Sequence, residues 1–182
     1  MHKSPSADRA DENDSRTTPA ADLEAVFSQN WERVCNILFR LTGDRAEAED
    51  LAVETFVRLW QRPPANLQTV GGWLYRVAVN LGYNALRAAR RRQSYELSAG
   101  EGALDLNTPE TPAGMVEEAE ERRRVRSILA QMPDRQAQML ILRSSGLSYK
   151  EIAAALQISP TSVGTLLTRA EQEFEKRYST GG

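Results

Sequence analysis

Apolar residues recur at steps of three and four positions along most of this 182-residue sequence, and that spacing places them on one face of an α-helix. The first half predicts three helices, at about residues 22–42, 45–61 and 73–93. Pro63-Pro64 ends the second helix, because proline has no backbone N–H and restricts the residue before it. A loop is expected to run through Gly71-Gly72, and no stretch of this half reads as a β-strand.

A change of composition separates this half from a second helical region. Residues 98–111 are rich in Gly, Ala, Pro, Asp and Thr, and the stretch from Glu96 to Glu121 holds eight acidic residues and no basic one. Further helices are expected at about 116–131, 134–144, 148–156 and 160–177. The sequence therefore predicts an all-α fold of two small helical domains, one of three helices and one of four, joined by a flexible acidic linker. The predicted boundaries are a disordered tail at 1–21, a first domain at 22–95, the linker at 96–115, a second domain at 116–178 and a tail at 179–182.

The composition excludes several kinds of chemistry. The one histidine, His2, lies in the polar N-terminal tail, and the one cysteine, Cys35, cannot form an internal disulfide, so zinc sites and catalytic triads built on these residue types are not expected. Cys35 lies on the apolar side of the first helix, which favours a buried, inert thiol. No cofactor is predicted, and an enzyme is the least favoured class of protein.

The overall charge and hydropathy add two further limits. The chain has 23 Lys and Arg against 25 Asp and Glu, a net charge of −2, so bulk charge alone does not indicate a nucleic-acid binder. No run of about 18 apolar residues is present, which argues against a transmembrane helix. The N-terminus lacks the apolar core of a signal peptide, so a cytoplasmic protein is expected.

A helix-turn-helix is predicted near the C-terminus. Ser148 and Glu151 form the pattern of a capping box, Ala153 allows a close helix approach, and Ser159-Pro160 opens the next helix. This register favours a DNA-binding unit over a generic helical hairpin. The candidate DNA-facing residues are Ser159, Thr161, Ser162, Thr165, Thr168 and Arg169. Only Arg169 among them is charged, and three glutamates follow it, so low affinity for duplex DNA is expected from this element alone.

The third helix carries a basic stripe. Between Thr69 and Tyr95 there are five arginines and no acidic residue. Polar residues at helical spacing form one face, with Trp73, Tyr75 and Tyr83 in or beside it: Arg76, Asn80, Asn84, Arg87 and Arg91. Arginines that follow a backbone and rings that stack on bases suit single-stranded or melted nucleic acid. A solvated helix face whose aromatic residues belong to the core stays open as the alternative.

The second helix has an acidic face of a different kind. Asp50, Glu54 and Arg58 step along its polar side together with Glu47, and Trp60 lies at its end. No histidine or metal cluster accompanies the carboxylates, so acid–base catalysis is not indicated. A solvated face or a protein-docking face remains, and Trp60 favours docking.

Taken together, these segments resemble a known family. The segment from Gly43 to Trp60 resembles the polymerase-binding part of region two in bacterial sigma factors of the extracytoplasmic-function (ECF) group. The segment from Gly72 to Asn80, followed by Asn84-Ala85-Leu86-Arg87, resembles the promoter-melting helix of that group. Two further segments resemble region four of the group, namely Met132-Pro133-Asp134-Arg135-Gln136 and Gly146 to Ala153. The likeness covers about residues 22–95 and 116–178 in the order and spacing of the family.

The resemblance implies a role for each element. Asp50, Glu54, Arg58 and Trp60 would face the clamp coiled coil of core RNA polymerase, and the flap of the polymerase is a further expected contact. The loop at 63–72 and the third helix would recognise and open the minus-ten element of promoter DNA, through Trp73, Arg76, Asn80, Asn84, Arg87 and Arg91. The helix-turn-helix, about 148–170, would lie on the minus-thirty-five element, and an anti-sigma factor would hold the protein inactive.

One departure from the family concerns the recognition helix. Where the family commonly has basic residues this chain has Gly164, Leu166 and Thr168, and an acidic run follows from Glu171. The prediction is an alternative sigma factor that directs core RNA polymerase to promoters. Two alternatives stay open, namely a sigma-like adaptor and a helix-turn-helix regulator, each acting mainly through protein contacts with weak duplex DNA binding.

Overall fold

The structure is a computed structural model that describes residues 19–65, 69–98 and 113–180. Over these ranges the chain forms α1 (Pro19–Thr42), α2 (Arg45–Gln61), α3 (Val70–Ser98), α4 (Ala113–Leu129), α5 (Asp134–Ser144), α6 (Tyr149–Leu156) and α7 (Pro160–Thr180), and no strand. The predicted all-α class is confirmed. Most of the predicted N-terminal tail, residues 1–18, and the predicted linker from 99 to 112 lie outside the described residues.

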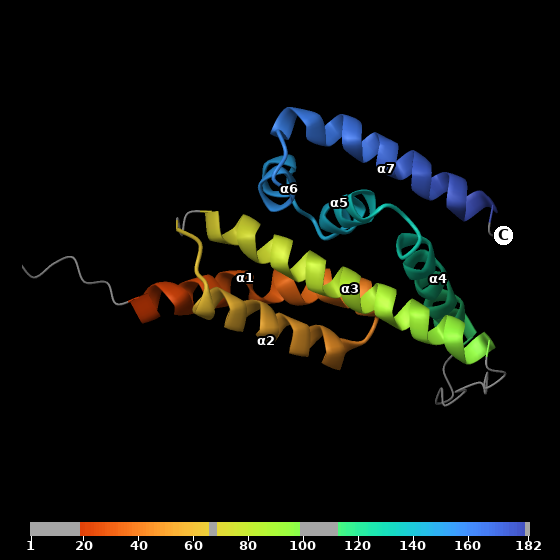
Figure 1. The fold of residues 1–182 in the computed structure, drawn as a ribbon, viewed down its shortest axis with the longest axis horizontal. Coiled ribbons are helices and arrows are strands. Elements are labelled where there is room, and N and C mark those ends of the chain that lie inside the picture. The colour runs from red at the N-terminus through yellow and green to blue at the C-terminus, as the bar shows by residue number, and fades with distance from the viewer. Residues whose placement is uncertain (1–18, 66–68, 99–112, 181–182) are drawn as a thin grey trace, which may run out of the picture.

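The first domain consists of α1, α2 and α3, which run side by side along the molecule (Figure 1). The predicted break between α1 and α2 is confirmed: Gly43 has a positive φ of 73°, and the Asp44 carboxylate caps α2 by accepting a hydrogen bond from the Glu47 amide at 2.8 Å. Fully buried side chains from all three helices, among them Leu38, Leu59 and Leu74, close the core.

The start of α3 differs from the prediction. The helix begins at Val70, so Gly71 and Gly72 lie in its first turn and not in a loop. Packing against the second domain explains Gly72 better than a turn does. A Cβ atom on Gly72 would lie 2.8 Å from Cβ of Ala154 in α6, so the missing side chain lets the two helices meet. The helix also runs to Ser98, five residues beyond the predicted end at 93.

The second domain, α4 to α7, contains the predicted helix-turn-helix. Ser148 and Glu151 form the expected capping box at the start of α6. The turn into α7 passes through Gln157 in the left-handed conformation, with φ of 54°. Leu142, Ile152 and Val163 are fully buried and join α5, α6 and α7 into one core.

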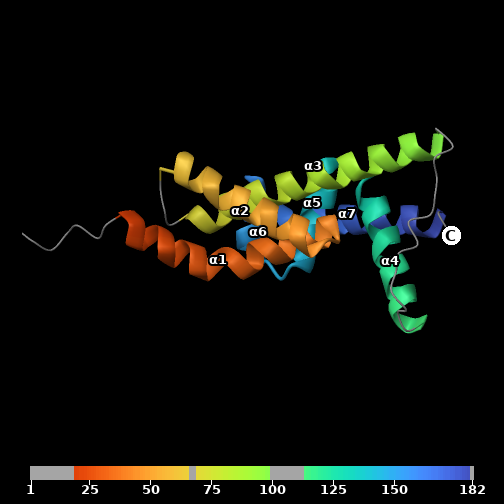
Figure 2. The same ribbon diagram turned by 90° about the horizontal axis from the view of Figure 1, so that it is seen from below.

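The two domains pack together through α3. This helix contacts α1 and α2 in its own domain and α5 and α6 in the second, as the two perpendicular views show (Figures 1 and 2). The buried apolar residues of both domains form one continuous cluster. The sequence predicted two domains on a linker, and it gave no sign of this packing. Within the described residues, no helix has the length and apolar character needed to cross a membrane.

Candidate nucleic-acid and protein interfaces

The basic stripe predicted on α3 exists as one helical face. Arg76 and Trp73 are half-buried, with Trp73 packed against the core, whereas Asn80, Asn84, Arg87 and Arg91 are exposed. The structure therefore brings the predicted minus-ten residues together along about five turns of one helix. The ring of Tyr83, by contrast, is only 1% exposed, so it is not available to stack on a base in this arrangement.

Part of this stripe is engaged by the second domain. The Asn80 side-chain oxygen accepts a hydrogen bond from Gln138 of α5 at 2.9 Å. One turn on, the Tyr83 hydroxyl donates to the backbone oxygens of Met132 at 2.9 Å and Leu129 at 3.2 Å, at the end of α4. Burial raises the pKa of Tyr83, so the hydroxyl stays a donor at neutral pH.

The next member of the stripe is ion-paired across the same boundary. Arg87 contacts the Asp134 carboxylate at 3.0 Å, and its guanidinium lies over the Tyr83 ring, 5.8 Å from the centroid. Asn80, Tyr83 and Arg87 thus face the second domain, whereas Asn84 and Arg91 do not contact it through any hydrogen bond or ion pair among the described residues.

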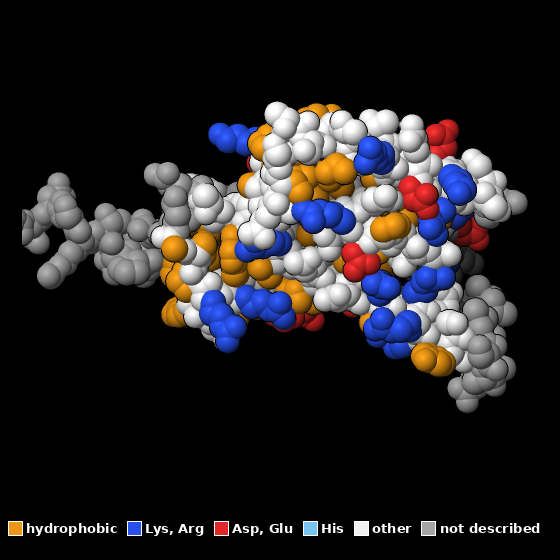
Figure 3. Space-filling view, turned by 45° about the horizontal axis from the view of Figure 1, so that its top comes forward, with side chains coloured by type: hydrophobic (Ala, Val, Ile, Leu, Met, Phe, Trp, Pro, Cys, Tyr) orange, Lys and Arg blue, Asp and Glu red, His pale blue; other side chains and the backbone are white. Residues whose placement is uncertain are grey.

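Arginines gather where the end of α3 meets α4. Arg87, Arg90 and Arg91 line a hollow of about 220 Å³ with Ser94 and Ala130. An adjoining hollow of about 360 Å³ adds three arginines from α4, which are Arg123, Arg124 and Arg126. Figure 3 shows Lys and Arg side chains collected at this end of the molecule. Burial, together with the charges of Arg123 and Arg122, lowers the pKa of Arg126, as expected where like charges crowd.

The acidic face of α2 is accompanied by exposed apolar residues. Glu54 and Arg58 form an ion pair at 2.6 Å, and Asp50 is exposed beside them. Trp60 is 78% exposed, Val53 52% and Val57 45%. Val57 and Trp60 are expected beside the acidic face from their positions in the sequence, and the structure adds Val53, whose spacing puts it on the same helical face. Solvent-facing apolar side chains on such a face indicate a protein contact.

An aromatic cluster continues this surface onto α1. The rings of Phe27 and Trp31 stack with centroids 4.9 Å apart, and Phe56 of α2 lies 4.8 Å from Phe27. Phe27 is 43% exposed. We call Val53, Val57, Trp60 and this aromatic cluster the α2 docking face.

The candidate DNA-facing residues of the helix-turn-helix lie mostly on its solvent-exposed side. Ser159, Thr161, Thr165, Thr168 and Arg169 are exposed and Ser162 is half-buried. The Ser159 and Thr161 hydroxyls are 2.7 Å apart at the start of α7. Glu173 forms an ion pair with Arg177 at 2.6 Å, which offsets part of the acidic run.

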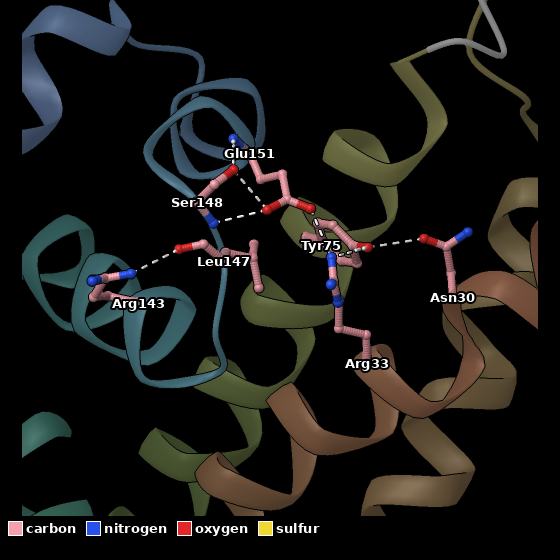
Figure 4. Close-up of polar contacts among 7 residues, drawn as sticks. All are labelled: Asn30, Arg33, Tyr75, Arg143, Leu147, Ser148 and Glu151. Atoms are coloured by element: carbon pink, nitrogen blue, oxygen red, sulfur yellow. Dashed lines mark hydrogen bonds and ion pairs between the residues drawn. The ribbon is translucent and has the colours of Figure 1, made fainter.

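A polar network ties the helix-turn-helix to the first domain (Figure 4). One carboxylate oxygen of Glu151 accepts from the Ser148 amide and hydroxyl at 2.8 and 2.7 Å, and the other contacts Arg33 of α1 at 2.7 Å. Arg33 also donates to the Tyr75 hydroxyl at 3.4 Å, and that hydroxyl donates to Asn30 at 2.9 Å. Local sequence gives no signal for this role of Arg33, because its partner Glu151 is 118 residues away.

The ionisation of Glu151 follows from these contacts. Burial alone would raise the pKa of this carboxyl, but the hydrogen bonds from Ser148 and the charge of Arg33 outweigh burial and hold the pKa of Glu151 below its ordinary value. The same carboxylate therefore caps α6 and bridges the two domains.

No metal site is visible in the ranges 19–65, 69–98 and 113–180, where no three His, Cys, Asp or Glu residues converge. Cys35 is half-buried, and burial raises the pKa of its thiol, which keeps the thiolate population low. An inert thiol at this position stays a prediction.

The comparisons with known proteins agree on both domains. The family described as Sigma-70 region 2 matches residues 26–92, and the family described as Sigma-70, region 4, matches residues 122–174. The chain is 32% identical over 163 residues to RNA polymerase sigma factor YlaC of Bacillus subtilis, covering 86% of this chain and 92% of that protein. It is 31% identical over 170 residues to the RNA polymerase sigma-H factor of Pseudomonas aeruginosa, covering 86% and 85%.

A solved structure shares the fold. The structure of CnrH in complex with the cytosolic domain of CnrY aligns with a TM-score of 0.54 at 17% sequence identity, over 91% of this chain and 92% of that one.

Proposed function

Because the chain belongs to the sigma-70 family, as an ECF-type sigma factor with regions 2 and 4, we propose that its exposed faces divide the work of promoter recognition among α2, α3 and α7. The protein is an RNA polymerase sigma factor that directs transcription initiation. Sigma factors are not enzymes, so nucleotide addition belongs to the polymerase. A helix-turn-helix regulator that works without polymerase would leave the match to region 2 unexplained. We place the protein in the cytoplasm, where it would meet core RNA polymerase.

Core polymerase would bind the α2 docking face together with Asp50, Glu54 and Arg58. The observation that carries this assignment is Trp60, a tryptophan that is 78% exposed beside two exposed valines. Exposed apolar surface bordered by charges is typical of an interface: the apolar residues supply burial and the charges set the register. The α2 docking face would bind the clamp coiled coil of the polymerase, and region 4 would bind the flap.

The minus-ten element would be melted along α3. Arginines at positions 76, 87 and 91 can follow a phosphate backbone, and the side-chain amides of Asn80 and Asn84 can bond to base edges. The absence of any acidic residue from Thr69 to Tyr95 supports this role, because one carboxylate in the stripe would repel phosphates. Trp73 is half-buried against the core, so we assign it mainly to holding the start of the helix.

The minus-thirty-five element would meet α7 through hydroxyl groups. Ser159, Thr161, Ser162, Thr165 and Thr168 can donate to phosphates or base edges, and Arg169 adds one charge. With a single charge-assisted contact, this helix would add position and some specificity to the complex but little affinity.

The test is complex formation with core RNA polymerase by size-exclusion chromatography. The wild-type protein is expected to co-elute, and Asp50→Ala/Glu54→Ala is expected to lose co-elution because the exposed charges that set the register are gone. Glu117→Ala/Glu120→Ala is the matched control, since it removes two exposed carboxylates from α4, outside the α2 docking face. Equal binding by both double variants would contradict the α2 assignment.

A protein inhibitor of the anti-sigma type would have a ready site between the domains. Side chains from α1, α4, α5 and α7 line a groove of about 750 Å³. Its apolar lining includes Phe39, Leu129, Leu140, Ile141 and Phe174. Four arginines but only two glutamates accompany these residues, namely Arg40, Arg122, Arg126, Arg143, Glu121 and Glu171. This surplus of positive charge around an apolar floor fits an amphipathic helix with acidic flanks.

The exposed rim of the groove offers a test. Phe39 is 46% exposed, so Phe39→Asp removes an anchor and adds repulsion toward acidic flanks without emptying the core. In bacterial cells, the amount of tagged Phe39→Asp protein bound at promoters on the chromosome is expected to rise above that of the tagged wild-type protein. Binding to purified core polymerase is expected to stay at the wild-type level. Occupancy equal to wild type would contradict an inhibitor in this groove.

A further inference from the structure

Arginines from two helices surround a hollow between the end of α3 and α4, which we call the arginine hollow. It has two adjoining parts of about 220 and 360 Å³, and Arg90 and Ala130 line both parts. Pockets that bind small molecules have about 300–1,000 Å³, so the larger part alone is of that size. The arginines in the lining are Arg87, Arg90 and Arg91 of α3 and Arg123, Arg124 and Arg126 of α4.

Most of these arginines lack a counter-charge. Arg87 pairs with Asp134 at 3.0 Å, and Arg124 donates to the backbone oxygen of Tyr178 at 2.8 Å. Four others form no hydrogen bond or ion pair with any residue that the structure describes, namely Arg90, Arg91, Arg123 and Arg126. Within the described part of the chain, the one carboxylate in the lining belongs to Glu47. The hollow therefore has a surplus of positive charge that its own side chains do not neutralise.

Arg126 shows the consequence of this crowding. Burial and the charges of Arg123 and Arg122 lower the pKa of Arg126, because both disfavour its charged form. The guanidinium of Arg126 packs against Gly43 at the turn between α1 and α2, in the space that a side chain there would fill. The charge is therefore held in place, and an anion in the hollow would offset the repulsion among the arginines.

We propose that the arginine hollow binds a chain of linked phosphate groups, as carried by a nucleoside triphosphate or by inorganic polyphosphate. Guanidinium groups donate pairs of hydrogen bonds to phosphate oxygens. Linked phosphates hold several negative charges on adjacent groups, whereas nucleic acid spreads one charge per nucleotide along its strand. A compact anion can therefore reach the arginines of both helices at once. Binding of this anion does not depend on the role proposed for α3 in promoter DNA.

The rest of the lining favours a nucleotide over inorganic polyphosphate. Part of the larger wall is apolar and consists of Leu41, Ala85, Leu86 and Ala89. Gln93 and Ser127 add neutral hydrogen-bonding groups. An apolar wall beside converging charged and polar groups is the usual composition of a small-molecule site. The base of a nucleotide would use the apolar wall and its phosphates the arginines, whereas inorganic polyphosphate would use the arginines alone.

Arg87 and Arg91 belong both to the arginine hollow and to the basic stripe of α3. A phosphate chain in the hollow would therefore compete with single-stranded DNA for these two charges. This consequence, unlike the binding itself, rests on the function proposed for α3.

The experiment is isothermal titration calorimetry of the full chain at low salt in a buffer with EDTA. The probes are ATP, AMP and inorganic tripolyphosphate. One hollow variant is Arg90→Gln/Arg123→Gln, which changes one exposed arginine on each helix. The other is Ala89→Glu, which keeps every arginine and adds a carboxylate at an exposed position in the lining.

The matched control is Lys150→Gln/Lys176→Gln. It also removes two positive charges, at exposed sites that do not line the hollow. Circular dichroism checks that each variant stays helical.

ATP is expected to bind at least about tenfold more tightly than AMP, because it brings more charged groups to the arginines. Both hollow variants are expected to weaken ATP binding about tenfold, and the lysine control less than about twofold. ATP that binds more tightly than tripolyphosphate identifies a nucleotide as the source of the phosphates, and equal or tighter binding of tripolyphosphate identifies inorganic polyphosphate. Saturating ATP is expected to weaken binding of a fluorescent single-stranded DNA to the wild-type chain.

Three outcomes would overturn the proposal. AMP that binds as tightly as ATP would show that no site for linked phosphates exists. ATP binding that both hollow variants leave unchanged would place the anion elsewhere on the chain. Equal weakening by the lysine control would reduce the effect to overall charge. If ATP binds in the hollow and DNA binding is unaffected, the phosphate site stands and the DNA role of Arg87 and Arg91 is wrong.

Discussion

The helices α3 and α7 are both assigned to promoter DNA, yet they differ in charge and in exposure. Between Thr69 and Tyr95 the first has five arginines and no acidic residue, whereas α7 has Arg169 followed by an acidic run. The basic helix is partly covered by the second domain, whereas most of the hydroxyls proposed to face DNA on α7 are exposed. The more basic surface and the more accessible surface therefore lie on different helices.

The largest expected effect tests the difference in charge. Arg90, Arg91 and Arg92 are exposed and form no ion pair with the second domain among the described residues, so Arg90→Gln/Arg91→Gln/Arg92→Gln removes the proposed phosphate contacts and leaves the domain packing intact. Binding to single-stranded DNA is expected to weaken about 10- to 100-fold, and the slope of log K against log salt to fall by about 2. Fluorescence anisotropy over a salt series measures both quantities.

The matched variant on the other helix is Arg169→Gln, which removes the one arginine of the exposed recognition surface. The affinity for single-stranded DNA is expected to fall by less than about fivefold, because only one exposed charge is removed. If the two sets of changes weakened binding equally, the contrast between α3 and α7 would be wrong.

The next effect concerns the glycines inside the same two helices. Gly82 lies in α3 where a Cβ atom would be 2.7 Å from the Leu41 side chain and 3.1 Å from that of Leu38. The glycine therefore sets how closely α1 and α3 pack. Gly82→Val is expected to destabilise the protein by about 1–3 kcal/mol through overpacking, measured by urea unfolding. An unchanged stability would mean that the core around α1 is loosely packed.

Gly164 in α7 is expected to behave in the opposite way. A Cβ atom there would meet only the Tyr149 ring, at 3.6 Å, an ordinary contact. Gly164→Ala is therefore expected to stabilise the helix by about 1 kcal/mol, or roughly 2–4 °C in Tm by calorimetry. A loss of stability would show that the helix-turn-helix depends on a close approach that these contacts do not contain.

The sequence predicts the helices well and their association poorly, and Gly72 of α3 shows why. Periodicity locates α3, but Gly71-Gly72 indicates a loop because local sequence carries no record of Ala154 in α6, against which Gly72 packs. The same holds for Arg33, whose ion pair spans 118 positions. Caps such as Asp44 with Glu47 are predictable because both partners lie within one turn.

The site residues divide along the same line. The spacing of polar residues predicts that Asn80 and Arg87 lie on one exposed face of α3. It does not predict their bonds to Gln138 and Asp134, because any polar residue of the second domain could have been the partner. The exposure of Val53 is predictable in the same way, because Val53 lies opposite the buried stripe of α2 at helical spacing from Val57 and Trp60.

The smallest expected effect on stability comes from Glu151 of α6, whose ion pair with Arg33 of α1 links the second domain to the first. Its pKa is held below the ordinary value of 4.5 in the folded protein, so its stabilising contribution is present above that value and is lost as pH falls through the lower folded pKa. Arg33 stays charged throughout, so the loss reflects the carboxylate alone. Glu151→Gln keeps a capping side chain but removes the charge.

The wild-type protein is therefore expected to exceed Glu151→Gln in stability by less than about 1 kcal/mol near neutral pH, because the ion pair is partly exposed. The difference is expected to shrink as pH falls below the ordinary value of 4.5 and through the lower folded pKa, where the wild-type carboxyl is protonated too. Urea unfolding of both proteins across this range measures it. A difference that persists in acid would assign the effect to the shape of the cap, and the charge of Glu151 would then contribute nothing to holding region 4 against α1.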